Sequence, residues 1–196
     1  MNTSLKLLRF LGPTLLFFGT FVIFPSLTMS YIEGALDKSL MAIWLVAVVY
    51  AIIISLTLRR RKFSYTPKDG FIITFVTWVL VSLIAALPFL NTGLSFSDSF
   101  FEAVSGLTTT GSTSIKDLSL LPDYILLYRQ LLQWAGGVGL VIVVLAIIPA
   151  VSGGMKVLQA ETAGFADKSF SPRLRETARS LLKFYLLITL VCAAAY

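Results

Sequence analysis

The residues best suited to chemistry lie in one short stretch, where five hydroxyl side chains and one glycine follow one another. The stretch covers residues 108–113 and reads Thr-Thr-Thr-Gly-Ser-Thr. Hydroxyl and carbonyl oxygens can replace the hydration shell of a cation, and no residue of the stretch is charged. Glu102 is the nearest carboxylate on its N-terminal side. The pattern therefore favours weak, reversible cation binding over acid–base or nucleophilic chemistry.

A short helix is predicted directly before this stretch, over residues 98–107. Its N-cap is expected at Ser95 or Ser97, and Asp98 suits the first turn. Ten helical residues cover about 15 Å, which is half of the roughly 30 Å hydrocarbon core of a bilayer. We therefore expect the segment to enter a membrane halfway and turn back. Its non-helical backbone would then have to be buried in protein or line a water-filled cavity.

Composition predicts an all-α integral membrane protein. Of 196 residues 57% are hydrophobic, and the mean hydropathy is +0.86. Histidine is absent and Cys192 is the single cysteine, which argues against imidazole chemistry, an intrachain disulfide and a thiolate metal site. Nothing resembles a nucleophile–base pair, so no enzyme is expected. The net charge of +6 comes from cations beside apolar segments, so no nucleic-acid partner is expected.

Apolar segments divide the chain. The expected divisions are an N-terminal transmembrane hairpin (1–66), a span–loop–span unit (67–151), a cytoplasmic connection (152–176) and the truncated start of a second unit (177–196). The span–loop–span unit consists of span 70–90, half-helix 98–107, loop 108–113 and span 123–149. The lipid bilayer is therefore an expected partner.

The distribution of charge predicts the orientation. Most of the 16 lysines and arginines fall on one side of the predicted spans, so the N-terminus is expected in the cytoplasm and the 108–113 loop opens to the outside. The outer side is mainly acidic, which would concentrate cations at the loop. Solvated loop ends are an equally good explanation for Asp117 and Asp123.

The motifs around the loop resemble the superfamily of potassium uptake proteins that comprises TrkH, TrkG, KtrB and HKT, and most closely its bacterial TrkH branch. The matching residues run colinearly along nearly the whole chain. They are Asp69-Gly70-Phe71, Leu87-Pro88-Phe89, Phe100-Phe101-Glu102-Ala103, residues 106–113, Tyr128-Arg129-Gln130, residues 133–139, Ala160-Glu161 and Pro172-Arg173 followed by Glu176-Thr177-Ala178. The resemblance identifies the chain as the N-terminal part of a longer member.

The resemblance implies a potassium-channel-like span–pore-loop–span repeat, preceded here by an extra two-helix hairpin. Four such units would surround one pore, each giving one strand of a selectivity filter. The implied potassium ligands are oxygens of Thr109 and Thr110, and Gly111, Ser112 and Thr113 would complete the filter strand. Thr108 and Glu102 would support it. Potassium would be the substrate, and no cofactor is implied.

The resemblance also implies partners and leaves alternatives open. Expected partners are a cytosolic TrkA-type nucleotide-binding regulator and a second copy of the full-length protein, in the bacterial inner membrane. Sodium-selective plant relatives carry serine in the first loop, so Gly111 favours potassium. A sodium-preferring or weakly selective relative and a non-conducting membrane scaffold remain the alternatives. Arg129 is expected to pair with Glu102, Asp123 or a lipid headgroup, with a role in gating as the alternative.

Glycines in the fourth span are expected to allow close helix packing, with a hinge as the alternative. They are Gly136, Gly137 and Gly139.

Overall fold

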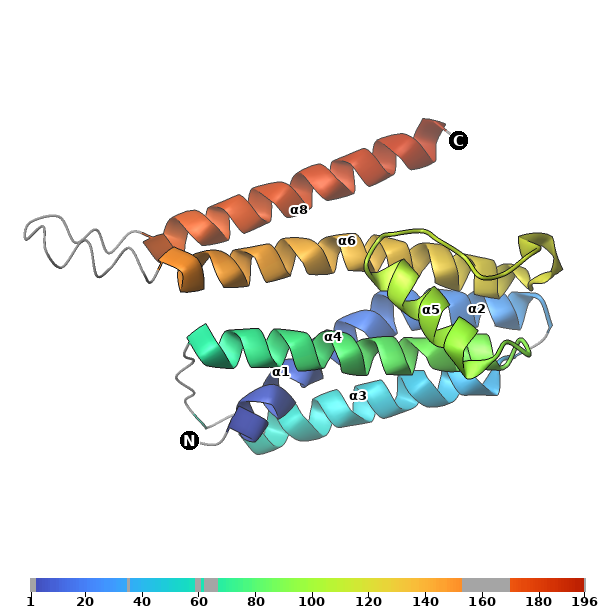
Figure 1. Cartoon of the computed structure of the whole chain (residues 1–196), viewed down its shortest axis with the longest axis horizontal. Helices are drawn as coiled ribbons and strands as arrows, with labels where there is room; N and C mark the ends of the chain where they lie inside the picture. The colour runs from blue at the N-terminus through green and yellow to red at the C-terminus, as the bar shows by residue number, and fades with distance from the viewer. Residues whose placement is uncertain (1–2, 35, 59–60, 62–66, 153–169, 196) are drawn as a thin grey trace, which may run out of the picture. The chain divides into compact units, whose positions relative to one another are not determined.

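The computed structural model describes residues 3–34, 36–58, 61, 67–152 and 170–195, and all regular structure in these residues is helical (Figure 1). Residues 1–137 form one compact unit and residues 138–196 form another. The first unit contains the predicted hairpin together with most of the predicted span–loop–span unit. The predicted cytoplasmic connection falls largely on residues 153–169, outside the described residues.

The chain begins with one long apolar helical stretch. It consists of α1 (Thr3–Phe18), the π-helical turn η1 (Gly19–Ile23) and α2 (Phe24–Ile32). Pro25 lies in the first turn of α2, where its missing N–H is tolerated. The widened π turn immediately before it accommodates the proline within the helical stretch. Helix α3 (Lys38–Leu58) follows and completes the hairpin.

The rest of the first unit holds the site. Helix α4 (Pro67–Leu90) is followed by the short α5 (Phe96–Leu107), a polar loop, the 3-10 turn η2 (Leu118–Leu120) and α6 (Asp123–Ser152), which continues into the second unit. The second unit also contains α8 (Phe170–Ala195). Within the described residues three helical stretches are long and apolar enough to cross a membrane: Thr3–Ile32, Lys38–Leu58 and Lys68–Leu90.

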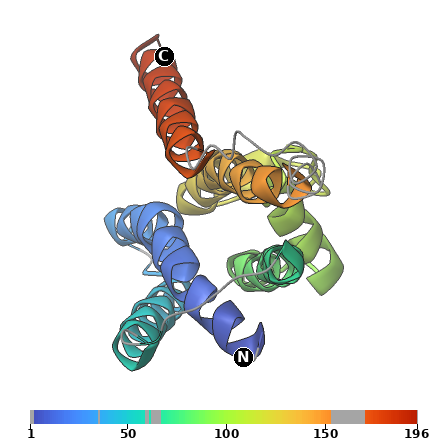
Figure 2. The ribbon, with the colours of Figure 1, turned by 90° about the vertical axis from the view of Figure 1, so that its left-hand side faces the viewer.

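The core of the first unit is shared by the hairpin, α4, α5 and the first half of α6. In Figures 1 and 2, α5 runs obliquely to α4 and α6 instead of parallel to them. Phe89 of α4 and Tyr128 of α6 are both fully buried, and their ring centroids lie 5.4 Å apart. Tyr128 also donates a hydrogen bond to the Ala85 carbonyl, so α6 is fastened to α4.

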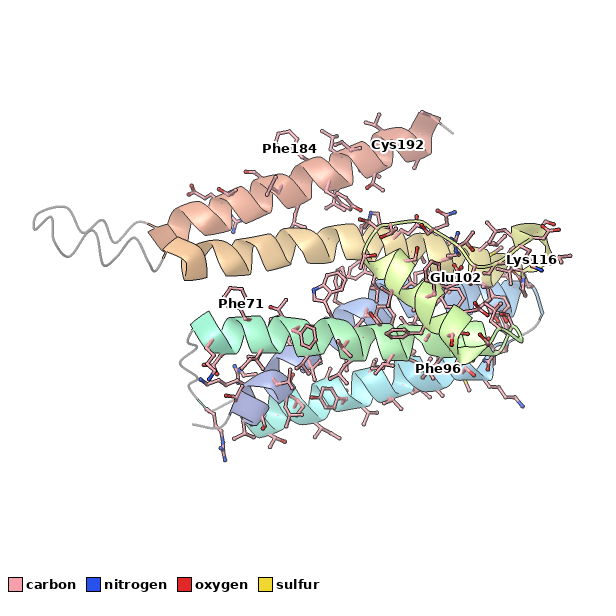
Figure 3. All side chains as sticks on the ribbon, in the orientation of Figure 1. Phe71, Phe96, Glu102, Lys116, Phe184 and Cys192 are labelled. Carbon is pink, nitrogen blue, oxygen red and sulfur yellow. The ribbon has the colours of Figure 1, made fainter. Side chains whose placement is uncertain are left out.

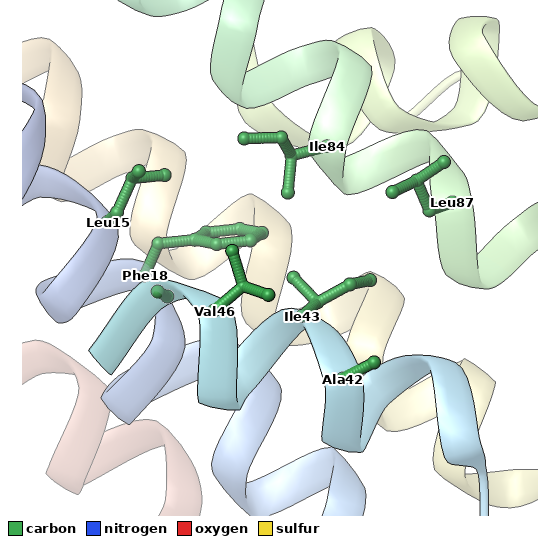
Figure 4. Close-up of a pocket in the computed structure, with 8 residues that line it drawn as sticks. Leu15, Phe18, Ala42, Ile43, Val46, Ile84 and Leu87 are labelled. Carbon is green, nitrogen blue, oxygen red and sulfur yellow. The ribbon is translucent and has the colours of Figure 1, made fainter. Parts of the chain in front are cut away.

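One cavity of the first unit is unsuited to binding a cation. It has a volume of about 230 Å³ and lies between α1, α3 and α4 (Figure 4). Its lining residues are all apolar: Leu15, Phe18, Ala42, Ile43, Val46, Ala47, Ile84 and Leu87. Such a cavity offers a cation no oxygen ligands. The ligands that a cation needs lie instead in the loop after α5.

Candidate cation site

Helix α5 is positioned by its cap and by an unusual buried face. Ser95, one of the two expected candidates, is the N-cap, and its hydroxyl accepts a hydrogen bond from the Asp98 N–H at 3.1 Å. The buried face is mostly small or polar, whereas Phe96 and Phe101 are exposed. The buried residues are Ser99, Glu102, Ala103, Ser105, Gly106 and Leu107. This arrangement turns apolar rings outward and polar groups toward the neighbouring helices, as suits a helix in a membrane.

The backbone after α5 alternates between negative and positive φ. Thr108 has φ −84°, Thr109 has φ +58° and Gly111 has φ +75°, whereas Thr110 is not among the positive-φ residues. A positive φ at a β-branched residue is strained by about 1–3 kcal/mol and occurs mainly at functional sites. Alternation of this kind turns successive N–H groups to one side of the chain.

The N–H groups of the loop point back to the end of α5. Thr110 and Gly111 both donate to the Ser105 carbonyl, at 3.0 and 3.4 Å, and Thr109 donates to the Gly106 carbonyl at 2.9 Å. Within the described residues, the carbonyls of Thr109 and Thr110 accept no hydrogen bond, and both residues are exposed. The C-terminal end of α5, which carries partial negative charge, lies beside them. These two oxygens are therefore free to ligate a cation.

The outer half of the loop, residues 111–114, is held against α5 and α6 by a buried ion pair. Arg129 Nε lies 2.7 Å from Glu102 Oε2, and the Glu102 side chain is fully buried where α5 passes α6 (Figure 3). Glu102 Oε1 accepts from the Thr113 hydroxyl at 2.6 Å and from the Ser114 N–H at 2.7 Å. Of the three partners expected for Arg129, the structure therefore shows Glu102.

Two side chains, one from α5 and one from α6, contact carbonyl groups of the loop. Ser105 Oγ donates to the Ser112 carbonyl at 2.6 Å, and Arg129 approaches the Gly111 and Ser112 carbonyls at 3.5 Å. The buried Glu102 carboxylate is compensated by hydrogen bonds from the Thr113 hydroxyl, the Ser114 N–H and Arg129, and by the positive charge of Arg129.

Close packing at glycine fixes the end of α5 against α6. A Cβ at Gly136 would overlap the Leu107 carbonyl, and a Cβ at Gly106 would lie 3.0 Å from the Leu132 Cβ. Gly136 thus lets the backbone of α5 touch α6 just before the loop, and close packing is the role that the structure supports for this glycine.

The structure brings the seven predicted site residues, Glu102 and residues 108–113, together with two residues that were not assigned to the site. Arg129 was expected near Glu102 but without a role at the loop carbonyls. Ser105 was not predicted, because serine is mostly an exposed residue and nothing in the sequence marks this one as buried. The Thr108 and Thr110 hydroxyls lie 2.8 Å apart on the exposed side.

The fold and the site together define a membrane protein whose described regular structure is helical, with a strained, hydroxyl-rich loop between two helices. The sequence profile of the TrkH family, described as cation transport protein, matches residues 40–196. The chain belongs to this family.

Several named relatives are similar over most of the chain. A Trk system potassium uptake protein TrkH from Salmonella typhimurium is 38% identical over 186 residues, which cover 92% of this chain and 38% of that protein. A TrkH from Halomonas elongata is 38% identical over 196 residues, covering 97% of this chain and 40% of its own length. A TrkG from Escherichia coli is 39% identical over 145 residues, covering 71% of this chain and 30% of that protein. The chain thus spans about two fifths of the TrkH relatives.

Proposed function

We propose that this chain is the N-terminal part of a potassium uptake protein and that its loop after α5 forms one strand of a selectivity filter. The relatives are named potassium uptake proteins, which are transporters and not enzymes. The observation that carries the proposal is the pair of free carbonyls at Thr109 and Thr110, exposed by the alternating backbone. Carbonyl oxygens in such a row can replace the hydration shell of potassium.

The other loop residues complete the proposed strand. Gly111 permits the positive φ that keeps the carbonyl row continuous, and Ser112 and Thr113 anchor its outer end. Thr108 and Glu102 support it from α5. Because no residue of the strand itself is charged, ions would be held weakly enough to pass. Three further units of the whole protein would supply the remaining strands around the pore.

Flux through such a filter would be driven by the membrane potential. One elementary charge crossing 100 mV releases about 2.3 kcal/mol, enough to concentrate potassium some tens-fold. A sodium-preferring transporter is the alternative within the same family, and serine in place of Gly111 would favour it. A scaffold without transport would have no use for the strain at Thr109.

Uptake by the whole protein tests the function. We expect it to restore rubidium uptake, and growth at low potassium, in cells that lack their own potassium uptake systems. The same cells carrying an empty vector are the control. Rubidium uptake no faster than in the control, with the protein present in the membrane, would contradict the proposed function.

We propose that the N-terminus is cytoplasmic and that the loop opens to the outside of the inner membrane. Phe71 and Lys116 lie at opposite ends of the first unit (Figure 3). We expect a cysteine replacing Arg61 to react with a membrane-impermeant thiol reagent only in inverted vesicles, and one replacing Asp117 only in intact cells, in a background lacking Cys192. The reverse pattern would contradict this topology.

The whole protein is further proposed to form a homodimer and to bind a TrkA-type nucleotide-binding regulator on its cytoplasmic side. The name of the relatives' Trk system supports a membrane component of a larger assembly. Co-purification of both proteins from membranes, with the mass of the complex measured, tests both interactions. A monomer that does not retain the regulator would contradict them.

A further inference from the structure

The N-terminal hairpin is joined to the helices of the candidate site at both of its ends. At one end, Lys6 Nζ of α1 lies 2.6 Å from Asp69 Oδ2 at the start of α4, with both side chains buried, and the Thr3 hydroxyl donates to Asp69 Oδ1 at 3.1 Å. At the other end, the buried Asp37 joins α3 to both α4 and α6. The hairpin therefore holds more than its own two helices.

Asp37 accepts hydrogen bonds from α3, from the turn after α4 and from α6. Its Oδ1 accepts from the Ser39 and Leu40 N–H groups, at 2.8 and 3.1 Å, and so caps α3. Asn91, in the turn directly after α4, donates to Oδ1 at 3.4 Å and to Ser39 Oγ at 2.5 Å. The Tyr124 hydroxyl, in the first turn of α6, donates to Oδ2 at 3.1 Å. An ordinary N-cap would need only the first two of these bonds.

Tyr124 begins the face of α6 that organises the loop. Residues four apart lie on one side of a helix. On this side Tyr124 binds Asp37, Tyr128 binds the Ala85 carbonyl, Leu132 packs on Gly106, and Gly136 meets Leu107. Arg129 follows Tyr124 by five residues, or about 7.5 Å of helix.

We propose that Asp37 is a positioning residue for the filter, acting through Tyr124. By holding the first turn of α6, it sets the depth of Arg129 and hence the contacts of Arg129 with Glu102 and with the Gly111 and Ser112 carbonyls. The N-terminal hairpin then stabilises the position of the outer half of the loop. This proposal rests on the proposed potassium uptake function.

The test is Tyr124→Phe in the whole protein, which removes one hydroxyl and keeps the ring. Rubidium uptake is measured at matched amounts of membrane protein, giving KM, maximal rate and the ratio of rubidium to sodium uptake. We expect a several-fold rise in KM and a several-fold fall in the ratio. The matched control is Tyr50→Phe, which removes a hydrogen bond to the Leu8 carbonyl within the hairpin and should leave both values unchanged.

Three outcomes separate the possibilities. Unchanged KM and ratio in Tyr124→Phe would overturn the proposal, including when only the maximal rate falls, because a purely structural bond changes the amount of active protein alone. A second variant, Asn91→Ala, is expected to change KM and the uptake ratio in the same directions but by less. Unchanged values in this variant would contradict a role of the hairpin in positioning the loop. Absence of uptake by the unmodified protein would instead contradict the proposed function itself.

Discussion

Replacing Gly136 by alanine is expected to lower rubidium uptake per molecule by about tenfold or more. The added Cβ would overlap the Leu107 carbonyl, which is backbone and cannot rotate away. Overpacking of this kind costs about 1–3 kcal/mol, and about 1.4 kcal/mol corresponds to a factor of ten. The end of α5 would have to move from α6, and the loop that starts there would move with it.

Gly70→Ala is the matched control for this prediction. Gly70 also lies in a helix, α4, but a Cβ there would meet nothing within 4 Å. Alanine is the better helix former at both positions, so helix propensity cannot explain a difference between them. We expect wild-type uptake for Gly70→Ala. Equal uptake by both variants would show that the close approach at Gly136 is unnecessary.

Replacing Arg129 by glutamine is expected to destabilise the outer loop strongly. It leaves the buried Glu102 carboxylate with the Thr113 hydroxyl and the Ser114 N–H but without its cation. Removal of one partner from a buried ion pair costs about 3–5 kcal/mol. We expect uptake near background and a lowered thermal midpoint of the purified whole protein.

The double variant distinguishes lost charge balance from lost contacts. Glu102→Gln combined with Arg129→Gln removes the uncompensated charge and should recover part of the thermal midpoint, while uptake stays low because the loop carbonyls have lost Arg129. Lys116→Gln makes the same charge change at an exposed position beyond the loop and should resemble wild type. A double variant no more stable than Arg129→Gln alone would contradict the buried-pair account.

The helices of the first unit could be predicted because their signals are local. Apolar length predicted the span 70–90, which lies within α4, and Ser95, one of the two expected N-caps, directly precedes α5. The compact unit of residues 1–137 could not be predicted from local patterns. The hairpin shares an apolar core with α4, α5 and α6, and the buried pair of Lys6 and Asp69, which joins α1 to α4, connects residues 63 apart in the sequence.

The polar contacts of the site could be predicted only in part. Glu102 was one of three partners expected for Arg129, because a carboxylate within a membrane needs a partner. The bond of Tyr124 to Asp37 spans 87 residues and has no local pattern, and Asp37 looked like any outer loop acid. The positive φ of Thr109 was also hidden, because threonine normally avoids it. Residues that depart from local preference can be recognised only in the folded chain.

The most direct test of the central claim, that residues 108–113 form a filter strand, is the ratio of rubidium to sodium uptake by Gly111→Ser in the whole protein. The nearest atom to a Cβ at Gly111 is Gln133 Nε2 at 3.8 Å, so serine fits and acts through the backbone at φ +75°. Gly93→Ser imposes a similar strain at φ +86° outside the loop and is the control. We predict a reduced ratio for Gly111→Ser alone. An unchanged ratio for Gly111→Ser, with the protein present and transporting, would contradict the filter assignment.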